Sequence, residues 1–397
     1  MIQLSKRLEA MEESATLAMS RISRELRAAG KDIISLSLGE PDFNTPEFIK
    51  DAAIEGMKQN YTSYTPVAGY DDLLQSISDK FKRDNQLNYS KEQIVVSTGA
   101  KQSIANVVMS CINPGDEVII PAPYWVSYVE IVKVAEGNPV HVTATIDHDF
   151  KITPEQLESV ITPKSKMIIF STPCNPTGSV YTKEELEGLA EVIARHPHLV
   201  VIADEIYERI NFQGGHHSLA SFDSIYNQVV TVNGVSKAWA MTGWRLGYIG
   251  APKLIADACT KIQGQFTSAT CSITQRAAIA AMKAEPAVLK DMISAFRTRR
   301  DLVLRHLNEM PGVKTNIPQG AFYVFPDISS FFGKSYKGTT VNDAGELCIY
   351  ILNEANLALV TGEAFGDSNC LRISYAASEE VLIEAMSRMK DALSKLK

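Results

Sequence analysis

Lys237 and Arg245 are the residues whose chemistry and spacing first suggest a reaction site. Lys237 lies in the segment GVSKAWAMTGWRLG, residues 234–247, directly after an apolar, β-branched run at 229–232. Such a run predicts a buried strand that carries Lys237 to the edge of a sheet. Burial lowers the pKa of a lysine, and the resulting neutral amine can form a Schiff base with a carbonyl. The guanidinium of Arg245 suits a phosphate or carboxylate. The alternative is that Lys237 is a solvated lysine in a loop. The other residues near it in the fold must decide between these two interpretations.

The elements that would position these residues follow an alternating pattern. Short apolar runs alternate with longer amphipathic ones, which is typical of an α/β fold with a mostly parallel central sheet covered by helices. The expected strands are 94–97, 117–120, 167–171, 199–203, 229–232 and 246–250. The expected helices are 46–59, with Thr45 as its cap, 71–84, 101–111, 183–194 and 255–265. Thr182 and Glu185 have the spacing of a capping box at the start of 183–194.

The pattern changes after about residue 285, where a long charged helix, two short strands and a final helix are expected. An N-terminal helix and strand have no βα partner nearby, so we expect them to join this C-terminal part. These elements are expected at 16–29, 33–38, 322–325, 371–374 and from Glu379 onward. The sequence therefore predicts a large domain over 46–285 and a smaller, discontinuous α+β domain formed by 1–45 and 286–397.

Composition narrows the classes of function. The 397 residues carry a formal net charge of −7 without a basic stripe, which argues against nucleic-acid binding as the main role. The absence of a long apolar run or an apolar leader predicts a cytoplasmic protein without a membrane partner. The six cysteines include no CxxC pair and the histidines show no ligand spacing, so we expect reduced thiols and no metal site.

Ligands of open parallel sheets bind beyond the carboxyl ends of the strands, so polar residues after each apolar run are candidates. Gly99 and Ala100 follow the run 94–97, just before a helix whose free N–H groups could hold a phosphate. A tight turn that needs a glycine is the alternative. Asn175 lies between Pro173 and Pro176 in a rigid loop, where it could orient its amide or simply form a turn.

An acidic residue and a phenol follow the run 199–203. A carboxylate such as that of Asp204 keeps a pyridinium nitrogen protonated, and a phenol such as that of Tyr207 can hydrogen-bond a ring oxygen. Helix capping by Asp204 is the alternative. A reactive lysine, a carboxylate, a phenol, an oriented amide, a phosphate turn and an arginine together match the needs of pyridoxal phosphate.

Several segments then carry a family resemblance. Besides 234–247, these are GEPDF at 39–43, PYWVSY at 123–128, NPTG at 175–178, DEIY at 204–207 and LRISYA at 371–376. Over nearly its whole length the chain resembles the class I aminotransferases, which are fold-type I pyridoxal-phosphate enzymes, and within them the bacterial aspartate aminotransferases. Cys174 stands where relatives often carry a small or polar residue, and we expect it to be tolerated.

The resemblance implies roles for individual residues. Lys237, Asp204 and Tyr207 would be catalytic, with Lys237 as the Schiff-base lysine and proton carrier. The residues implied to hold the cofactor are Gly99, Ala100, Lys101, Trp125, Asn175, Asp204, Tyr207, Ser236, Lys237 and Arg245, with Tyr64 contributed by the neighbouring subunit of a homodimer. The residues implied to bind substrate are Gly39, Trp125, Asn175 and Arg372 for the α-carboxylate end, and Lys101, Ser14 and Thr16 for a second carboxylate.

The implied reaction moves an amino group from aspartate to 2-oxoglutarate by a ping-pong mechanism, giving oxaloacetate and glutamate. The partners would thus be amino acids and 2-oxo acids. The motifs specify the cofactor more sharply than the side-chain pocket, so transfer from aromatic amino acids or alanine, or to prephenate, remains an alternative. A carbon–sulfur lyase of the same fold is another alternative, since it would share Lys237, Asp204 and Tyr207.

Overall fold

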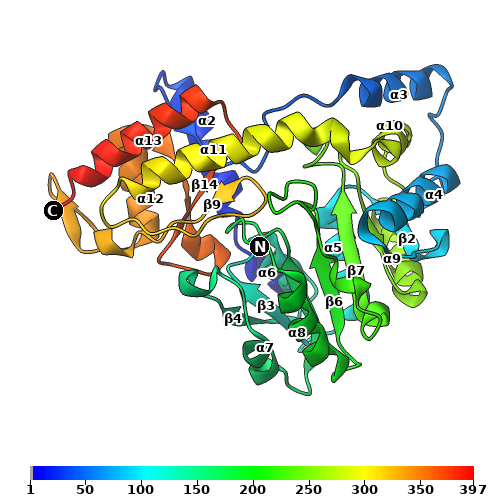
Figure 1. Ribbon diagram of the computed structural model, residues 1–397. Coiled ribbons are helices and arrows are strands. Elements are labelled where there is room, and N and C mark those ends of the chain that lie inside the picture. Colours follow the sequence, from blue (N-terminus) through cyan, green and yellow to red (C-terminus); the bar gives the residue numbers. More distant parts are fainter. Residues whose placement is uncertain (1–2) are drawn as a thin grey trace.

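A computed structural model describes residues 3–397 and places a seven-stranded sheet at the centre of the molecule (Figure 1). The strand order is β2-β8-β7-β6-β5-β3-β4. The strands are β2 (Ile94–Ser97), β3 (Glu117–Ala122), β4 (Asn138–Thr143), β5 (Ser165–Ser171), β6 (Val200–Asp204), β7 (Val229–Gly234) and β8 (Gly247–Gly250). Only β8 runs antiparallel to its neighbours β2 and β7. The expected α/β fold with a mostly parallel sheet is confirmed.

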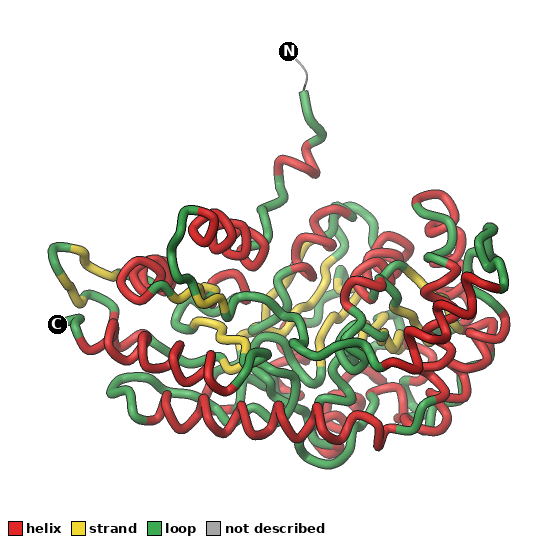
Figure 2. Tube along the Cα trace, turned by 90° about the horizontal axis from the view of Figure 1, so that it is seen from above, coloured by secondary structure: helices red, strands yellow, loops and turns green. Residues whose placement is uncertain are grey.

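Helices cover both faces of this sheet because alternate strand residues point to opposite sides. Ile169 packs in a cluster with α5 (Ala100–Cys111), α6 (Ser127–Val134) and α9 (Lys253–Phe266). Its neighbour Ile168 packs in a second cluster with α7 (Pro154–Val160), α8 (Lys183–Ala194), α4 (Asp71–Lys80) and α10 (Ser272–Lys283). Seen from above, the strands lie enclosed between helices (Figure 2). The sheet is therefore buried on both sides.

The first residues of two helices can be compared with the caps predicted from the sequence. In α8 the Thr182 hydroxyl accepts from the Glu185 amide at 3.2 Å and the Glu185 carboxylate accepts from the Thr182 amide at 2.7 Å, as predicted. The expected Thr45 cap is wrong. Helix α3 (Glu47–Lys58) begins one residue later than expected, after Pro46. The Thr45 hydroxyl instead donates to the carbonyl oxygen of Ala240 at 2.7 Å, so a tertiary contact replaces the cap.

The predicted helix 71–84 changes its geometry part of the way along. It is α-helical over α4 and continues as a π-helical turn over Phe81–Asn85. The Lys80 ammonium donates to the Asn85 amide oxygen at 2.8 Å across this turn, and both side chains are buried. A π turn is uncommon and brings these two polar groups to the protein interior.

A second group of elements surrounds smaller sheets. β9 (Tyr323–Val324), β14 (Leu371–Ser374) and β13 (Val360–Thr361) form an antiparallel sheet, and β10 (Lys334–Tyr336) pairs with β11 (Thr339–Val341). The helices of this group are α2 (Ala15–Ala28), α11 (Lys290–Asn308), α12 (Ala344–Ala355) and α13 (Glu379–Ser394). In Figure 1 the long yellow α11 and the red α13 run side by side, as their contacts require.

The N-terminal strand joins this second group. β1 (Ile34–Ser35) is shorter than the predicted 33–38 and pairs in parallel with β12 (Leu357–Ala358). Ahead of it, α1 (Lys6–Glu9) projects from the body in Figure 2 and contacts α6. An ion pair joins Arg7 to Glu136 at 3.1 Å. Within residues 3–397, no helix combines the length and the apolar character needed to cross a membrane.

Candidate active site

A cavity of about 260 Å³ opens at the carboxyl ends of the parallel strands. Its walls include most of the predicted site residues, namely Ser14, Thr16, Gly39, Ala100, Lys101, Trp125, Asn175, Asp204, Tyr207, Ser236, Lys237, Arg245 and Arg372. They come from both groups of elements, with Arg372 from β14 and Ser14 and Thr16 from the start of α2. Two predicted residues lie outside the wall. Gly99 packs behind Arg245, and Tyr64 is fully exposed.

Lys237 follows β7 and enters the cavity at its floor. Its Nζ donates to the carbonyl oxygen of Gly39 at 2.6 Å. Burial is the main cause that lowers its pKa to about 8; Glu40 opposes this shift, whereas the nearby cations Arg372 and Arg245 add to it. A neutral amine is therefore available slightly above neutral pH, which is what nucleophilic and proton-transfer chemistry needs.

Asp204 ends β6 with its carboxylate completely buried. Burial raises its pKa to about 6, while hydrogen bonds from the Tyr128 hydroxyl and the Ile206 amide hold it down. The two bonds measure 2.7 and 3.2 Å. Asp204 begins no helix, so the capping alternative is wrong. Tyr128 was missed by sequence reasoning, although it stands in the quoted segment PYWVSY, because its place on α6 reads as a core aromatic.

Tyr207 faces a second residue that sequence reasoning missed. Its hydroxyl lies 2.8 Å from the hydroxyl of Tyr323, a residue of β9. Both phenols are buried, and burial raises the pKa of each above its ordinary value. Tyr323 stands in the apolar run GAFYVF, which predicts a core strand and hides a polar role. The only sign of a polar role in this segment is that a tyrosine stands between apolar residues.

A cradle for an anion lies at the start of α5. Gly99 occupies its N-cap at φ +86°, and a Cβ there would lie 2.3 Å from Nη2 of Arg245. The Arg245 guanidinium donates to the carbonyl oxygen of Thr242 at 2.9 Å. Within the described chain Arg245 has no acidic partner. A free guanidinium beside the open N–H groups of a helix start is suited to a phosphate.

Arg372 is a buried cation that no carboxylate of residues 3–397 neutralises. It is 2% exposed. Its Nη1 donates to the Asn175 side-chain oxygen at 2.9 Å and its Nη2 to the Ser37 carbonyl at 2.5 Å. Its Nε has no hydrogen-bond partner. Since an uncompensated buried charge is costly, this arrangement prepares the guanidinium for an anionic ligand.

Lys101 provides a further cation in the same cavity. Its Nζ lies 5.0 Å from the centroid of the Trp125 ring. Burial, followed by repulsion from Arg245, lowers its pKa. No acidic group of the described residues pairs with it, and Ser14 and Thr16 share the cavity wall. The cavity thus holds three unpaired cations, at positions suited to a ligand with several anionic groups.

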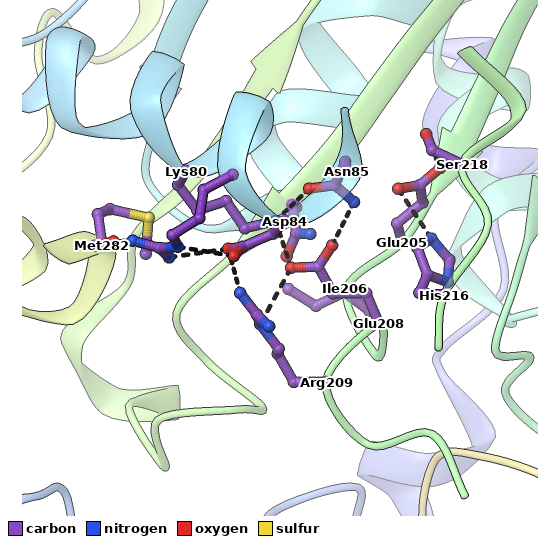
Figure 3. Close-up of polar contacts among 12 residues, drawn as sticks. Lys80, Asp84, Asn85, Glu205, Ile206, Glu208, Arg209, His216, Ser218 and Met282 are labelled. Carbon is purple, nitrogen blue, oxygen red and sulfur yellow. Dashed lines mark hydrogen bonds and ion pairs between the residues drawn. The ribbon is translucent and has the colours of Figure 1, made fainter. Parts of the chain in front are cut away.

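A buried polar network around Glu205 and Glu208 lies outside the cavity (Figure 3). On one side the imidazole Nε2 of His216 lies 2.9 Å from Glu205 Oε2, and the Ser218 hydroxyl donates to Glu205 Oε1 at 2.6 Å. Burial opposes protonation of His216, but the attraction of Glu205 outweighs it and raises the His216 pKa. This cluster could not be predicted from the sequence, because Glu205 and His216 meet only through the fold.

The other side of the network is centred on Glu208. Lys80 forms an ion pair with its carboxylate, Asn85 donates to it at 2.8 Å and Arg209 lies 3.6 Å away. Burial alone would raise the pKa of Glu208, but Lys80 and Arg209 lower it to about 2. Glu205, Glu208 and His216 offer ligand atoms within 4.8 Å of one another. Lys80 and Arg209 already pair with Glu208, which reduces the negative charge that this cluster could offer to a cation.

The six cysteines are free thiols, of which Cys174, beside Asn175, is buried. Its thiol faces the carbonyl oxygen of Pro123 at 3.7 Å and lies outside the cavity wall. Burial raises the pKa of this thiol, so it stays protonated at neutral pH.

Comparison with known proteins identifies the family of this chain. Residues 31–389 match the model of the family described as aminotransferase class I and II. The chain is 48% identical over 401 residues to a bifunctional aspartate aminotransferase and glutamate/aspartate-prephenate aminotransferase of Petunia hybrida, covering 100% of this chain and 84% of that one. It is 46% identical to the aspartate/prephenate aminotransferase of Cereibacter sphaeroides, with 98% of each covered.

Solved structures give the same result. The aspartate aminotransferase of Rhizobium meliloti superposes with a TM-score of 0.97 at 40% identity, covering 100% of both chains. The aspartate aminotransferase of Thermus thermophilus with maleate gives a TM-score of 0.93 at 38% identity, covering 99% of this chain and 100% of that one. The chain therefore belongs to the class I and II aminotransferases and has their fold.

Proposed function

We propose that this aminotransferase uses pyridoxal phosphate to move the amino group of aspartate to 2-oxoglutarate. The observation that carries the proposal is the set of unpaired cations in one cavity with Lys237. Arg372 and Lys101 are two separate sites for carboxylates, and Arg245 is a site for a phosphate. An amino acid with two carboxylates and a phosphorylated cofactor together supply the missing negative charges.

The residues of the cavity fit this cofactor. The phosphate would be held by Arg245, Ser236 and the start of α5 at Gly99 and Ala100. In support, the Arg245 cation has no acidic partner among the described residues and lies beside the free N–H groups of this helix start. The buried Asp204 carboxylate would pair with the ring nitrogen, and Tyr207 with Asn175 would contact the ring oxygen, while Trp125 covers the ring face. When bound, pyridoxal phosphate supplies an electrophilic carbonyl carbon and an electron-accepting ring.

The chain's own groups then perform the proton transfers. With a pKa of about 8, Lys237 Nζ can take up a proton as a base and return it as an acid near neutral pH. The Tyr128 hydroxyl stabilises the charged form of Asp204, so that this carboxylate can hold a positive charge beside it. Arg372, with Asn175 and Gly39, would orient the α-carboxylate and so fix the position of the reacting carbon.

Aspartate is the favoured donor because Lys101, with the hydroxyls of Ser14 and Thr16, offers a second carboxylate site. The relatives named for aspartate, and the Thermus thermophilus protein solved with the dicarboxylate maleate, support this reading. Several relatives are also named for prephenate, which makes prephenate a second candidate substrate. Aromatic amino acids and alanine lack the second carboxylate and would leave Lys101 unpaired.

A panel of amino donors with 2-oxoglutarate as acceptor tests the proposal. We expect the highest kcat/KM with aspartate, and a second series with prephenate as acceptor measures the other candidate. Equal kcat/KM for aspartate, alanine and phenylalanine would contradict the dicarboxylate assignment. Release of pyruvate and ammonia from cystathionine without amino transfer would instead identify a carbon–sulfur lyase.

We further propose a homodimer in which Tyr64 reaches the phosphate site of the neighbouring subunit. Its ring is fully exposed, which is unusual for a large aromatic side chain and supports a role outside its own chain. Sedimentation analysis at several protein concentrations tests the assembly, and a monomer would overturn it. The division into domains at 46–285, with 1–45 and 286–397, and the cytoplasmic location stay predictions.

A further inference from the structure

A pair of phenols joins the two groups of elements inside the cavity. Tyr207 follows β6 of the large sheet, whereas Tyr323 belongs to β9 of the small one. Their hydroxyls lie 2.8 Å apart, within hydrogen-bond distance, and either can donate to the other. Both side chains are buried, so this bond is protected from competition by bulk water.

Tyr323 also contacts the carboxylate site. The guanidinium carbon of Arg372 lies 4.7 Å from the centroid of the Tyr323 ring, in the geometry of a cation–π contact. This placement follows from the sheet, since β9 pairs with β14 and Tyr323 lies opposite Ser374, two residues beyond Arg372. One side chain therefore touches the Tyr207 phenol with its hydroxyl and the arginine with its ring.

The backbone of Gly39 packs against the same hydroxyl. A Cβ on Gly39 would lie 2.1 Å from the Tyr323 hydroxyl oxygen, so only glycine leaves room for it. Gly39 is also the residue whose carbonyl accepts the Lys237 hydrogen bond. The Tyr323 side chain thus lies where three groups of the site meet, namely Tyr207, Arg372 and the backbone of Gly39 that holds Lys237.

We propose that Tyr323 is a positioning residue that couples the carboxylate site at Arg372 to the hydrogen bond that Tyr207 makes to the cofactor. If Tyr207 is to give its proton to the cofactor's ring oxygen, its own oxygen is free to accept the proton of Tyr323. A phenol that accepts a hydrogen bond is a stronger donor, so Tyr323 strengthens the bond from Tyr207. A carboxylate that binds Arg372 shifts the Tyr323 ring, which contacts the guanidinium. The Tyr323 hydroxyl then transmits this shift to Tyr207.

The inference rests on the proposed cofactor, so its test reads the cofactor rather than the reaction rate. The visible absorption band of the lysine-bound cofactor is titrated with pH in the full-length enzyme. A hydrogen-bond donor to the ring oxygen favours the deprotonated form of the lysine-bound cofactor. Weakening that hydrogen bond therefore raises the pH midpoint of the titration. In Tyr323→Phe, which removes only the hydroxyl, we expect the midpoint to rise by about 0.5 to 1 pH unit.

Tyr375→Phe is the matched control. Tyr375 is also fully buried in the adjoining part of the fold, but its hydroxyl lies outside the cavity wall and donates to the carbonyl oxygen of Ala321 at 3.3 Å. This variant is expected to keep the wild-type midpoint. An equal shift in Tyr375→Phe and Tyr323→Phe would show a general loss of packing and overturn the proposal.

Two further measurements separate positioning from structure. Because Tyr323 acts through Tyr207, the double variant Tyr207→Phe/Tyr323→Phe is expected to have the midpoint of Tyr207→Phe alone. Succinate, a dicarboxylate without an amino group, is expected to shift the wild-type midpoint and to shift that of Tyr323→Phe less. Additive shifts in the double variant, or an unchanged response to succinate, would overturn the coupling.

The same titration distinguishes this inference from the proposed function. A wild-type protein without a visible band after incubation with pyridoxal phosphate would overturn the cofactor assignment, and the coupling with it. A normal wild-type band with an unaltered midpoint in Tyr323→Phe would overturn the coupling alone.

Discussion

The carbonyl oxygen of Gly39 accepts a 2.6 Å hydrogen bond from Nζ of Lys237, and this bond ties the N-terminal segment to the reactive lysine. The amine is thereby held in a fixed direction while burial lowers its pKa to about 8. A lysine that is both oriented and easily deprotonated is prepared for attack on a carbonyl carbon.

Replacement of this lysine tests the chemistry directly. In Lys237→Ala we expect the visible band of bound pyridoxal phosphate to be lost and amino transfer to fall by more than about 10³-fold, because nucleophile and proton carrier are removed together. Absorption spectra and steady-state rates measure both. Lys261→Ala, at an exposed position of α9, is the control and should behave as wild type. A persistent band in Lys237→Ala would contradict the assignment.

Lys101 tests the choice of substrate. Lys101→Met keeps an aliphatic side chain beside Trp125 but removes the charge, so we expect the KM for aspartate to rise by about 10-fold or more. The KM for phenylalanine should change little, because phenylalanine has no second carboxylate. Steady-state kinetics with both donors compare the two effects. Equal increases would show that Lys101 supports the cavity in general and does not select the donor.

Gly99 tests the phosphate cradle, and Gly115 offers a matched control. Both have a left-handed backbone, at φ +86° and +89°, but a Cβ meets Arg245 only at Gly99 and finds nothing within 4 Å at Gly115. The positive φ strains an alanine at either position, at a cost of about 1 kcal/mol or more of unfolding free energy. We expect only Gly99→Ala to weaken pyridoxal phosphate binding, by about 10-fold or more, since it displaces the guanidinium. Equal Kd values for the two variants would refute the cradle.

Glu208 tests the network behind the site and gives a pH dependence. Its pKa is lowered to about 2 from an ordinary 4.5, so its contribution to stability is complete above pH 4.5 and is lost as the pH falls toward 2. The shift corresponds to about 3 kcal/mol. Glu208→Gln should therefore lower the unfolding free energy by about that amount at pH 7, and the difference from wild type should shrink below pH 4.5.

Glu309→Gln is the control for that measurement. Glu309 forms an ion pair with Lys390 at 2.9 Å on the surface, where water screens the charges. Its replacement should leave the denaturation midpoint nearly unchanged at pH 7. If Glu208→Gln and Glu309→Gln behave alike in chemical denaturation, the buried network contributes little to stability.

The predictable part of the molecule follows from local patterns. Lys237 and Asp204 were expected at strand ends because buried runs precede them, and in a parallel sheet these ends meet at one edge. The capping box at Thr182 was equally local. Tyr128 and Tyr323 were missed because a hydroxyl in an apolar segment has no signature until its partner is known, and His216 meets Glu205 only through the fold.

The parallel pairing of Ile34 with Leu357 sets the order in which the catalytic centre can assemble. A ribosome releases the N-terminal strand long before it makes the partner strand, so the two cannot pair until synthesis is nearly complete. Ser14, Thr16 and Gly39 belong to the same N-terminal segment as this strand. The seven-stranded sheet can thus form early, whereas the part of the cavity wall that these residues supply is completed last. A truncated nascent chain therefore has no complete substrate-binding site.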